Sequence, residues 1–250
     1  MGRLIGGLLD NDSPFGRIMT KIGIIIGANL MFVLFSLPVV TIGPGIAALH
    51  YCMLKCLREG GTINPFKTFW AGFKMNFKQA LICSLGAAVI AAVLVLDIRF
   101  CTYYGGPLVP FKYACYALLL FLIIEMVYLF PVMAAFDDTI GHLLRNALFF
   151  ASRRPLKMLL AVAIHVIPVA VTIIDTHMRP LYGFLWVVCA AGLIAMLMAE
   201  LLLKDFEQYL PSADPDQESE PEDIAGTSVH DTVSKKTQRE ILKEMKKLDK

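Results

Sequence analysis

The chain has 250 residues, of which 57% are hydrophobic and 18% are charged, and its mean hydropathy is +0.64. Soluble globular domains contain about 45–50% apolar and about 25% charged residues, so this composition excludes an ordinary soluble fold. The net charge of +2 gives no electrostatic support for a nucleic-acid partner.

Several stretches are long and apolar enough to cross a lipid bilayer. A helix needs about 20 apolar residues to span about 30 Å of hydrocarbon, because unpaired backbone groups are costly in lipid. The predicted spans are residues 22–40, 80–100, 113–135, 156–174 and 181–203. The sequence therefore predicts an all-α fold, a polytopic membrane helix bundle with about five transmembrane helices inside a membrane domain of residues 1–210.

A helix-breaking sequence follows the first predicted span. We expect the break at Thr41, Gly43, Pro44 and Gly45. The apolar segment at 46–58 would be about 20 Å long as a helix, which is too short to cross. It is either a re-entrant arm or an interfacial helix, and the sequence leaves both open.

Residues 66–78 have an amphipathic pattern. Aromatic residues at helical spacing lie opposite three lysines, which is typical of a helix on a membrane surface. The aromatic residues are Phe66, Phe69, Trp70, Phe73 and Phe77, and the lysines are Lys67, Lys74 and Lys78.

The composition changes abruptly beyond the last span. Residues 211–233 are rich in acidic residues and proline, which predicts a disordered linker. Residues 234–250 are rich in Lys and Arg and carry one apolar stripe, which predicts a short basic amphipathic helix.

The distribution of Lys and Arg predicts the orientation. Most basic residues lie between the first and second spans, between the third and fourth, and after the last, whereas the other connections hold only Arg99, Lys112 and Arg179. The positive-inside rule then places the C-terminus in the cytoplasm. The side of the N-terminus depends on whether residues 46–58 return through the membrane.

Three polar residues lie within predicted spans, where such side chains are costly and are candidates for function: Asn29, Glu125 and His165. For Asn29 we favour an interhelical hydrogen bond without a ligand. Glu125 and His165 have equal predicted depths on consecutive helices, so we expect them to pair. The alternative is a proton or ligand site.

The sequence contains no signature of a common catalytic site. We find no Walker loop, nucleophile elbow, zinc-protease motif or dinucleotide fingerprint. His50, Cys52 and Cys56 share a short helix but have no fourth ligand nearby, so they are weak candidates for zinc. We predict no catalytic residue, cofactor or metal, and hence no enzyme.

A family resemblance rests on the sequence between Asn29 and Leu49, whose core is Leu-Pro-x-x-Thr-Ile-Gly-Pro at 37–44. This core resembles the signature of the YesL family, bacterial membrane proteins built on a domain of unknown function. The resemblance covers residues 1–205, with Phe32 and Gly45 in place of the expected Trp and Ala.

The resemblance implies a location in the bacterial cytoplasmic membrane. YesL-like proteins tend to be encoded beside carbohydrate ABC importers and two-component sensors. The resemblance therefore implies a non-enzymatic accessory protein whose partners are the lipid bilayer and either importer subunits or a membrane sensor kinase. It transfers no catalytic residue.

A small membrane transporter or channel with a polar site between helices is the alternative. The broken helix, Glu125 and His165 favour it, because discontinuous helices often form substrate sites. The sequence shows no repeated halves, which many transporters of that kind have.

Overall fold

The computed structural model describes residues 14–61, 63–106 and 109–209, and every regular element within them is helical. Six of these helices are long and apolar enough to cross a membrane, by length and composition. The predicted all-α polytopic bundle is thus confirmed, with six such helices in place of about five. The predicted linker at 211–233 and basic helix at 234–250 lie outside the described residues.

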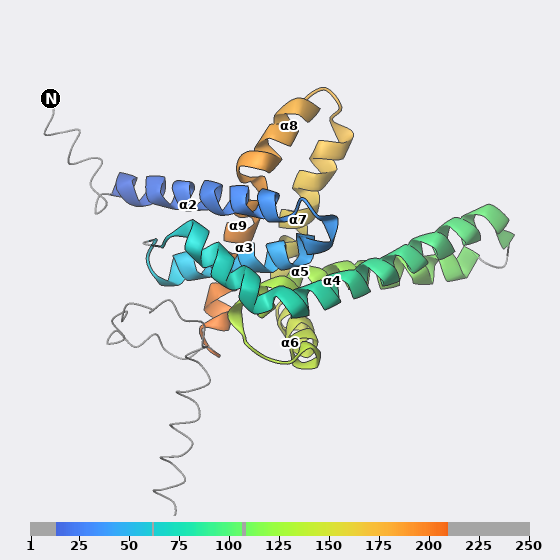
Figure 1. Cartoon of the computed structure of the whole chain (residues 1–250). Helices are drawn as coiled ribbons and strands as arrows, with labels where there is room; N and C mark the ends of the chain where they lie inside the picture. Colours follow the sequence, from blue (N-terminus) through green and yellow to red (C-terminus); the bar gives the residue numbers. More distant parts are fainter. Residues whose placement is uncertain (1–13, 62, 107–108, 210–250) are drawn as a thin grey trace, which may run out of the picture. The chain divides into compact units, whose positions relative to one another are not determined.

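Figure 1 shows how the helical elements are arranged. In chain order they are α2 (Pro14–Phe35), η1 (Val39–Thr41), α3 (Ile42–Arg58), α4 (Pro65–Tyr104), α5 (Val109–Ala135), α6 (Ile140–Arg153), α7 (Pro155–Ile174), α8 (Arg179–Leu185), the π-helical segment η3 (Trp186–Ala190) and α9 (Ala191–Phe206).

The first span ends at Phe35 and not at residue 40. Pro38 lacks a backbone N–H and restricts the residue before it, so the helix cannot continue through this point. The Thr41 hydroxyl donates to the carbonyl oxygens of Phe35 at 2.6 Å and Pro38 at 2.7 Å. The helix break therefore lies at residues 36–41 and includes Thr41.

The prediction that Gly43, Pro44 and Gly45 break the helix is wrong, because all three lie in the first turn of α3. First-turn N–H groups have no intrahelical acceptor, so proline is tolerated there. A Cβ atom at Gly43 would overlap the Ser84 side chain and lie 2.9 Å from the carbonyl oxygen of Ala80. Gly43 thus allows α3 to pack closely on α4.

Helix α3 begins at Ile42, four residues before the predicted segment at 46–58, and has 17 residues. Together with η1 it forms the additional long apolar stretch. Along α3, Ala47, Ala48 and Met53 have no exposed surface. Helices α2, α4, α5 and α9 pack around it, so α3 is not an interfacial helix.

Helix α4 joins the predicted surface helix at 66–78 and the predicted span at 80–100 into one helix of 40 residues. Its length is about 60 Å, twice the hydrocarbon thickness. The prediction of a separate surface helix is wrong because residues 66–78 continue directly into the next span, and part of their aromatic face packs inside the protein while Phe66 and Trp70 stay exposed. The Phe73 ring centroid lies 5.0 Å from that of Phe35 on α2, and Phe69 is fully buried.

The outer ends of α4 and α5 form a hairpin that extends away from the other helices (Figure 1). Cys101 and Cys115 are buried in this hairpin, each 2% exposed. Val89, Val93 and Leu96 are exposed along one face of α4. This hairpin therefore presents an apolar surface with no partner among the described helices.

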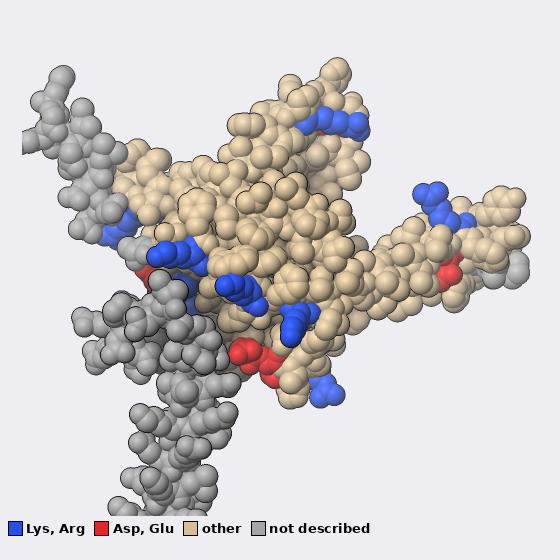
Figure 2. Space-filling view, in the orientation of Figure 1, with Lys and Arg blue, Asp and Glu red and all other residues tan. Residues whose placement is uncertain are grey.

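The sides of the helices carry few charges. On the face shown in Figure 2, Lys and Arg side chains form a row across the centre of the molecule, and other charged side chains lie near the tip of the α4–α5 hairpin. The remaining surface lacks charge, as expected for helices that contact lipid.

Candidate functional site

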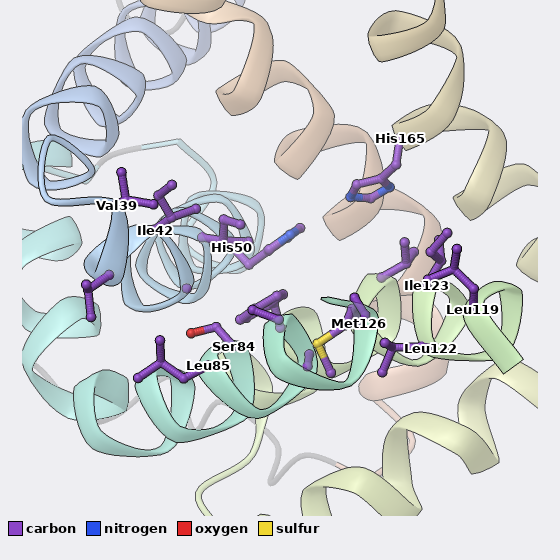
Figure 3. A pocket seen from close by; sticks show the side chains of 18 residues that line it. Val39, Ile42, His50, Ser84, Leu85, Leu119, Leu122, Ile123, Met126 and His165 are labelled. Atoms are coloured by element: carbon purple, nitrogen blue, oxygen red, sulfur yellow. The ribbon is translucent and has the colours of Figure 1, made fainter. Parts of the chain in front are cut away.

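The main cavity lies between η1, α3, α4, α5 and α7 and has a volume of about 590 Å³. That volume is within the range of about 300–1,000 Å³ that is typical of ligand pockets. Aliphatic side chains line most of it (Figure 3). The polar side chains in the lining are His50, Ser84 and His165.

His50 lies on α3 and is 4% exposed. Its Nδ1 atom is buried and has no hydrogen-bond partner among the described residues. Unpaired buried N–H groups are rarer than unpaired buried acceptors, so the favoured neutral tautomer carries its proton on Nε2. That N–H is then available to the cavity.

His165 lies on α7, and its Nδ1 atom is 2.9 Å from the carbonyl oxygen of Ala161, one turn earlier. A carbonyl oxygen only accepts hydrogen bonds, so Nδ1 is the donor. In a neutral ring this leaves Nε2 as an acceptor. The ring centroids of His165 and His50 are 6.5 Å apart, and the two rings face each other across the cavity (Figure 3).

The predicted pairing of Glu125 with His165 is wrong: the ring beside His165 belongs to His50. Glu125 on α5 is 8% exposed, and its Oε2 atom has no hydrogen-bond partner in the described part of the chain. Equal depth along two helices does not determine which way each side chain points around its helix. Sequence reasoning considered His50 only as a weak zinc ligand.

Asn29 forms hydrogen bonds between helices, which is the role that we favoured from the sequence. Its side-chain nitrogen donates to the carbonyl oxygens of Trp186 at 3.0 Å and Val187 at 2.7 Å. Its side-chain oxygen accepts from the backbone N–H of Gly192 at 2.8 Å. Asn29 thus connects α2 to η3 and α9, and it does not line the cavity.

A charged cluster that the sequence did not indicate joins the start of α7 to the end of α9. Asp205 is 7% exposed, and its carboxylate lies 2.6 Å from Nζ of Lys157 and 3.2 Å from a guanidinium nitrogen of Arg154. Lys157 also donates to the carbonyl oxygen of Leu201 at 3.1 Å. These contacts are between helices, which gives the cluster a structural role.

A metal centre has no support in the described residues, where no three His, Cys, Asp or Glu side chains gather closely enough to hold an ion. His50, Cys52 and Cys56 are all buried on α3.

These features define a class: an all-helical polytopic membrane protein with an apolar cavity between its helices. Residues 25–98, from α2 into the outer part of α4, match the family described as "Protein of unknown function, DUF624". The chain is 29% identical over 139 residues to "Uncharacterized protein YesL" of Bacillus subtilis (strain 168). That alignment covers 54% of this chain and 65% of YesL, just under two thirds of the relative's length.

The resemblance to the YesL family is therefore confirmed by the family match at residues 25–98 and by the similarity to YesL. No solved structure matches the chain significantly. The residues that the DUF624 family model matches include the helix break, α3 and His50, but neither Glu125 nor His165.

Proposed function

We propose that this protein is a non-enzymatic accessory protein of the bacterial cytoplasmic membrane that assembles with a carbohydrate ABC importer or with its membrane sensor kinase. The observation that carries the proposal is the α4–α5 hairpin, whose outer part has no partner among the described helices. Helices in lipid associate through close packing of their sides, so an isolated hairpin is a suitable docking element. The choice of partner rests on the resemblance to YesL-like proteins.

The lining of the cavity supports an accessory role over direct sugar transport. A sugar has many hydroxyl groups, and each needs a hydrogen-bond partner when it leaves water. Of the lining side chains, only those of His50, Ser84 and His165 have polar groups, and the Ser84 hydroxyl already donates to the carbonyl oxygen of Leu81 at 3.1 Å.

Co-purification in mild detergent tests the proposal. The variant Val89→Trp with Leu96→Trp adds bulk to the exposed face of α4, where these residues are 64% and 67% exposed. The control Ile173→Trp changes an α7 residue that is 64% exposed. We expect the wild-type protein and the control to retain importer permease subunits or the kinase, and the hairpin variant to lose them several-fold.

Equal recovery of the partner with all three proteins would show that the hairpin is not the docking element. Failure of the wild-type protein to retain either partner, when both are co-expressed with it, would contradict the accessory function.

We also propose that both chain ends face the cytoplasm. Six crossing helices would return the chain to its starting side, and Arg17 and Lys21 near the start of α2 then obey the positive-inside rule together with Lys204 near the end of α9. A reporter active only in the cytoplasm should work at Met1 and Lys250 and fail at Gly105. Silence at Met1 would mean that α3 does not cross.

A small transporter or channel is the second candidate. Two facing imidazoles at membrane depth, His50 and His165, favour it because intramembrane ionisable residues often mark ion pathways. Proton flux into liposomes that contain the purified protein tests this function. Flux that is absent, or that persists in His50→Phe with His165→Phe, would exclude a pathway through this pair.

A further inference from the structure

The cavity is lined by aliphatic side chains and opens at the outer surface of the protein. Val39 is 77% exposed, Leu85 45% and Ile123 39%, and all three contribute to the lining. In a bilayer such an opening faces hydrocarbon, so a lipid chain can enter without crossing water. Apolar walls suit an aliphatic chain because it needs no hydrogen bonds.

The two histidines give this apolar cavity one donor and one acceptor. His50 is more than nine-tenths buried, and its ring lines the cavity with Nε2–H as the available donor. His165 donates through Nδ1 to Ala161, and its Nε2 is the available acceptor. No hydrogen bond joins the two rings in the described part of the chain, so each is available to a third group.

We propose that this cavity binds a single-chain lipid with a neutral head that carries an O–H group, either a hydroxyl or a protonated carboxyl. An O–H group donates to Nε2 of His165, while an oxygen of the same head accepts from Nε2–H of His50. An ester head accepts only, so it leaves the His165 acceptor without a donor. This inference is independent of the proposed accessory function, since it concerns the cavity and not the hairpin.

Binding of three tritiated probes with the same chain length tests the proposal: hexadecanol, hexadecanoic acid and methyl hexadecanoate. The full chain is held in nanodiscs, and binding to empty nanodiscs is subtracted. We expect wild-type protein to bind hexadecanol about tenfold more tightly than the methyl ester, the effect of about one hydrogen bond. Tighter binding of the acid than of the alcohol would identify the head as a carboxyl, and weaker binding as a hydroxyl.

The variants His50→Phe and His165→Phe keep a ring in each place and remove its hydrogen bonds. His165→Phe removes the acceptor that only the alcohol uses, so we expect it to reduce the preference for the alcohol to within about twofold while binding of the ester stays unchanged. His50→Phe removes the donor that both heads use, so we expect it to weaken binding of the alcohol and of the ester alike. His50→Gln and His165→Gln keep a donor and an acceptor and should preserve part of the preference. Ala88→Phe, which fills the cavity, should weaken binding of all three probes.

Equal binding of hexadecanol and its ester analogue by the wild-type protein would overturn the proposal, because the cavity would then be a groove filled by any lipid chain. A preference that survives His165→Phe, or binding of the alcohol that is unchanged in His50→Phe, would also overturn it. If a Phe variant does not fold, as judged by its melting temperature, the Gln variants decide the outcome. A preference smaller than that of the wild type in folded His165→Gln, with unchanged ester binding, would then support the proposal, and a preference unchanged from wild type would contradict it.

Discussion

The side-chain oxygen of Asn29 on α2 accepts a hydrogen bond from the backbone N–H of Gly192 on α9 at a distance of 2.8 Å. The two helices approach so closely here that a Cβ atom at Gly192 would lie 2.8 Å from the carbonyl oxygen of Ile25. The same amide donates to the π-helical segment η3. A π-helical turn is rare and uses i→i+5 hydrogen bonds, and the Asn29 amide donates to two carbonyl groups of this one.

Replacing this amide should destabilise the protein. Asn29→Ala removes three hydrogen bonds between helices and should lower the free energy of unfolding by about 1–2 kcal/mol. Thr20→Val is the control, because among the described residues the Thr20 hydroxyl donates only to the carbonyl oxygen of Gly16 within its own helix. Thermal unfolding in detergent measures both variants. An equal effect of the two would mean that the contacts of Asn29 contribute nothing beyond local structure.

Replacing two glycines of α4 with alanine should have different effects on the stability of the protein. A Cβ at Gly72 would lie 2.7–2.9 Å from atoms of Tyr51, including its Cβ, whereas a Cβ at Gly86 would meet nothing within 4 Å. Gly72→Ala should therefore cost about 1–3 kcal/mol through overpacking. Gly86→Ala should leave stability unchanged or raise it by up to about 1 kcal/mol, since alanine favours helix. Melting temperatures in detergent test both changes, and a harmless Gly72→Ala would contradict the α3–α4 packing.

The Lys157–Asp205 pair should show energetic coupling. Removing Asp205 strands the Lys157 charge in a partly buried site, and removing Lys157 leaves Asp205 with Arg154 as its partner, whereas removing both leaves two apolar groups. In a double-mutant cycle of Lys157→Leu and Asp205→Leu, we expect a coupling of at least about 1 kcal/mol. Unfolding free energies in detergent supply the four values. Additive effects would show that the 2.6 Å contact does not stabilise the fold.

Asp175 should make the turn between α7 and α8 sensitive to acid. A hydrogen bond from the Tyr182 hydroxyl, assisted by the backbone N–H groups of Met178 and His177, lowers the pKa of this carboxyl. Its folded pKa is below its unfolded value, so its contribution to stability is present above the usual aspartate pKa of about 3.9 and is lost as the pH falls through the folded pKa.

The matched variant for this effect is Asp175→Asn, which keeps the side-chain oxygen but not the charge. At pH 7 the wild type should melt at a higher temperature than this variant, and the difference should shrink once the pH falls below about 4. A difference that is constant from pH 7 to pH 3 would show that the charge of Asp175 has no part in stability.

The sequence alone predicted the all-α membrane class and most of the spans. It also predicted that Asn29 forms a hydrogen bond between helices. Lipid cannot pair with backbone groups, so a run of about 20 apolar residues has almost no alternative to a crossing helix. An asparagine at that depth needs a partner from another helix. Both inferences depend on local composition, and local composition is visible in the sequence.

Only the tertiary structure decided three other features. Residues 66–78 continue into the next span, α3 is buried, and His165 lies beside His50. An amphipathic pattern indicates that one face is covered, but it does not distinguish lipid from the Phe35 ring that packs against Phe73 of α4. Depth along a helix can be counted from the sequence, whereas the direction of a side chain around it depends on how the helices rotate as they pack. For that reason Glu125 and His165 have equal predicted depths, yet His165 faces His50.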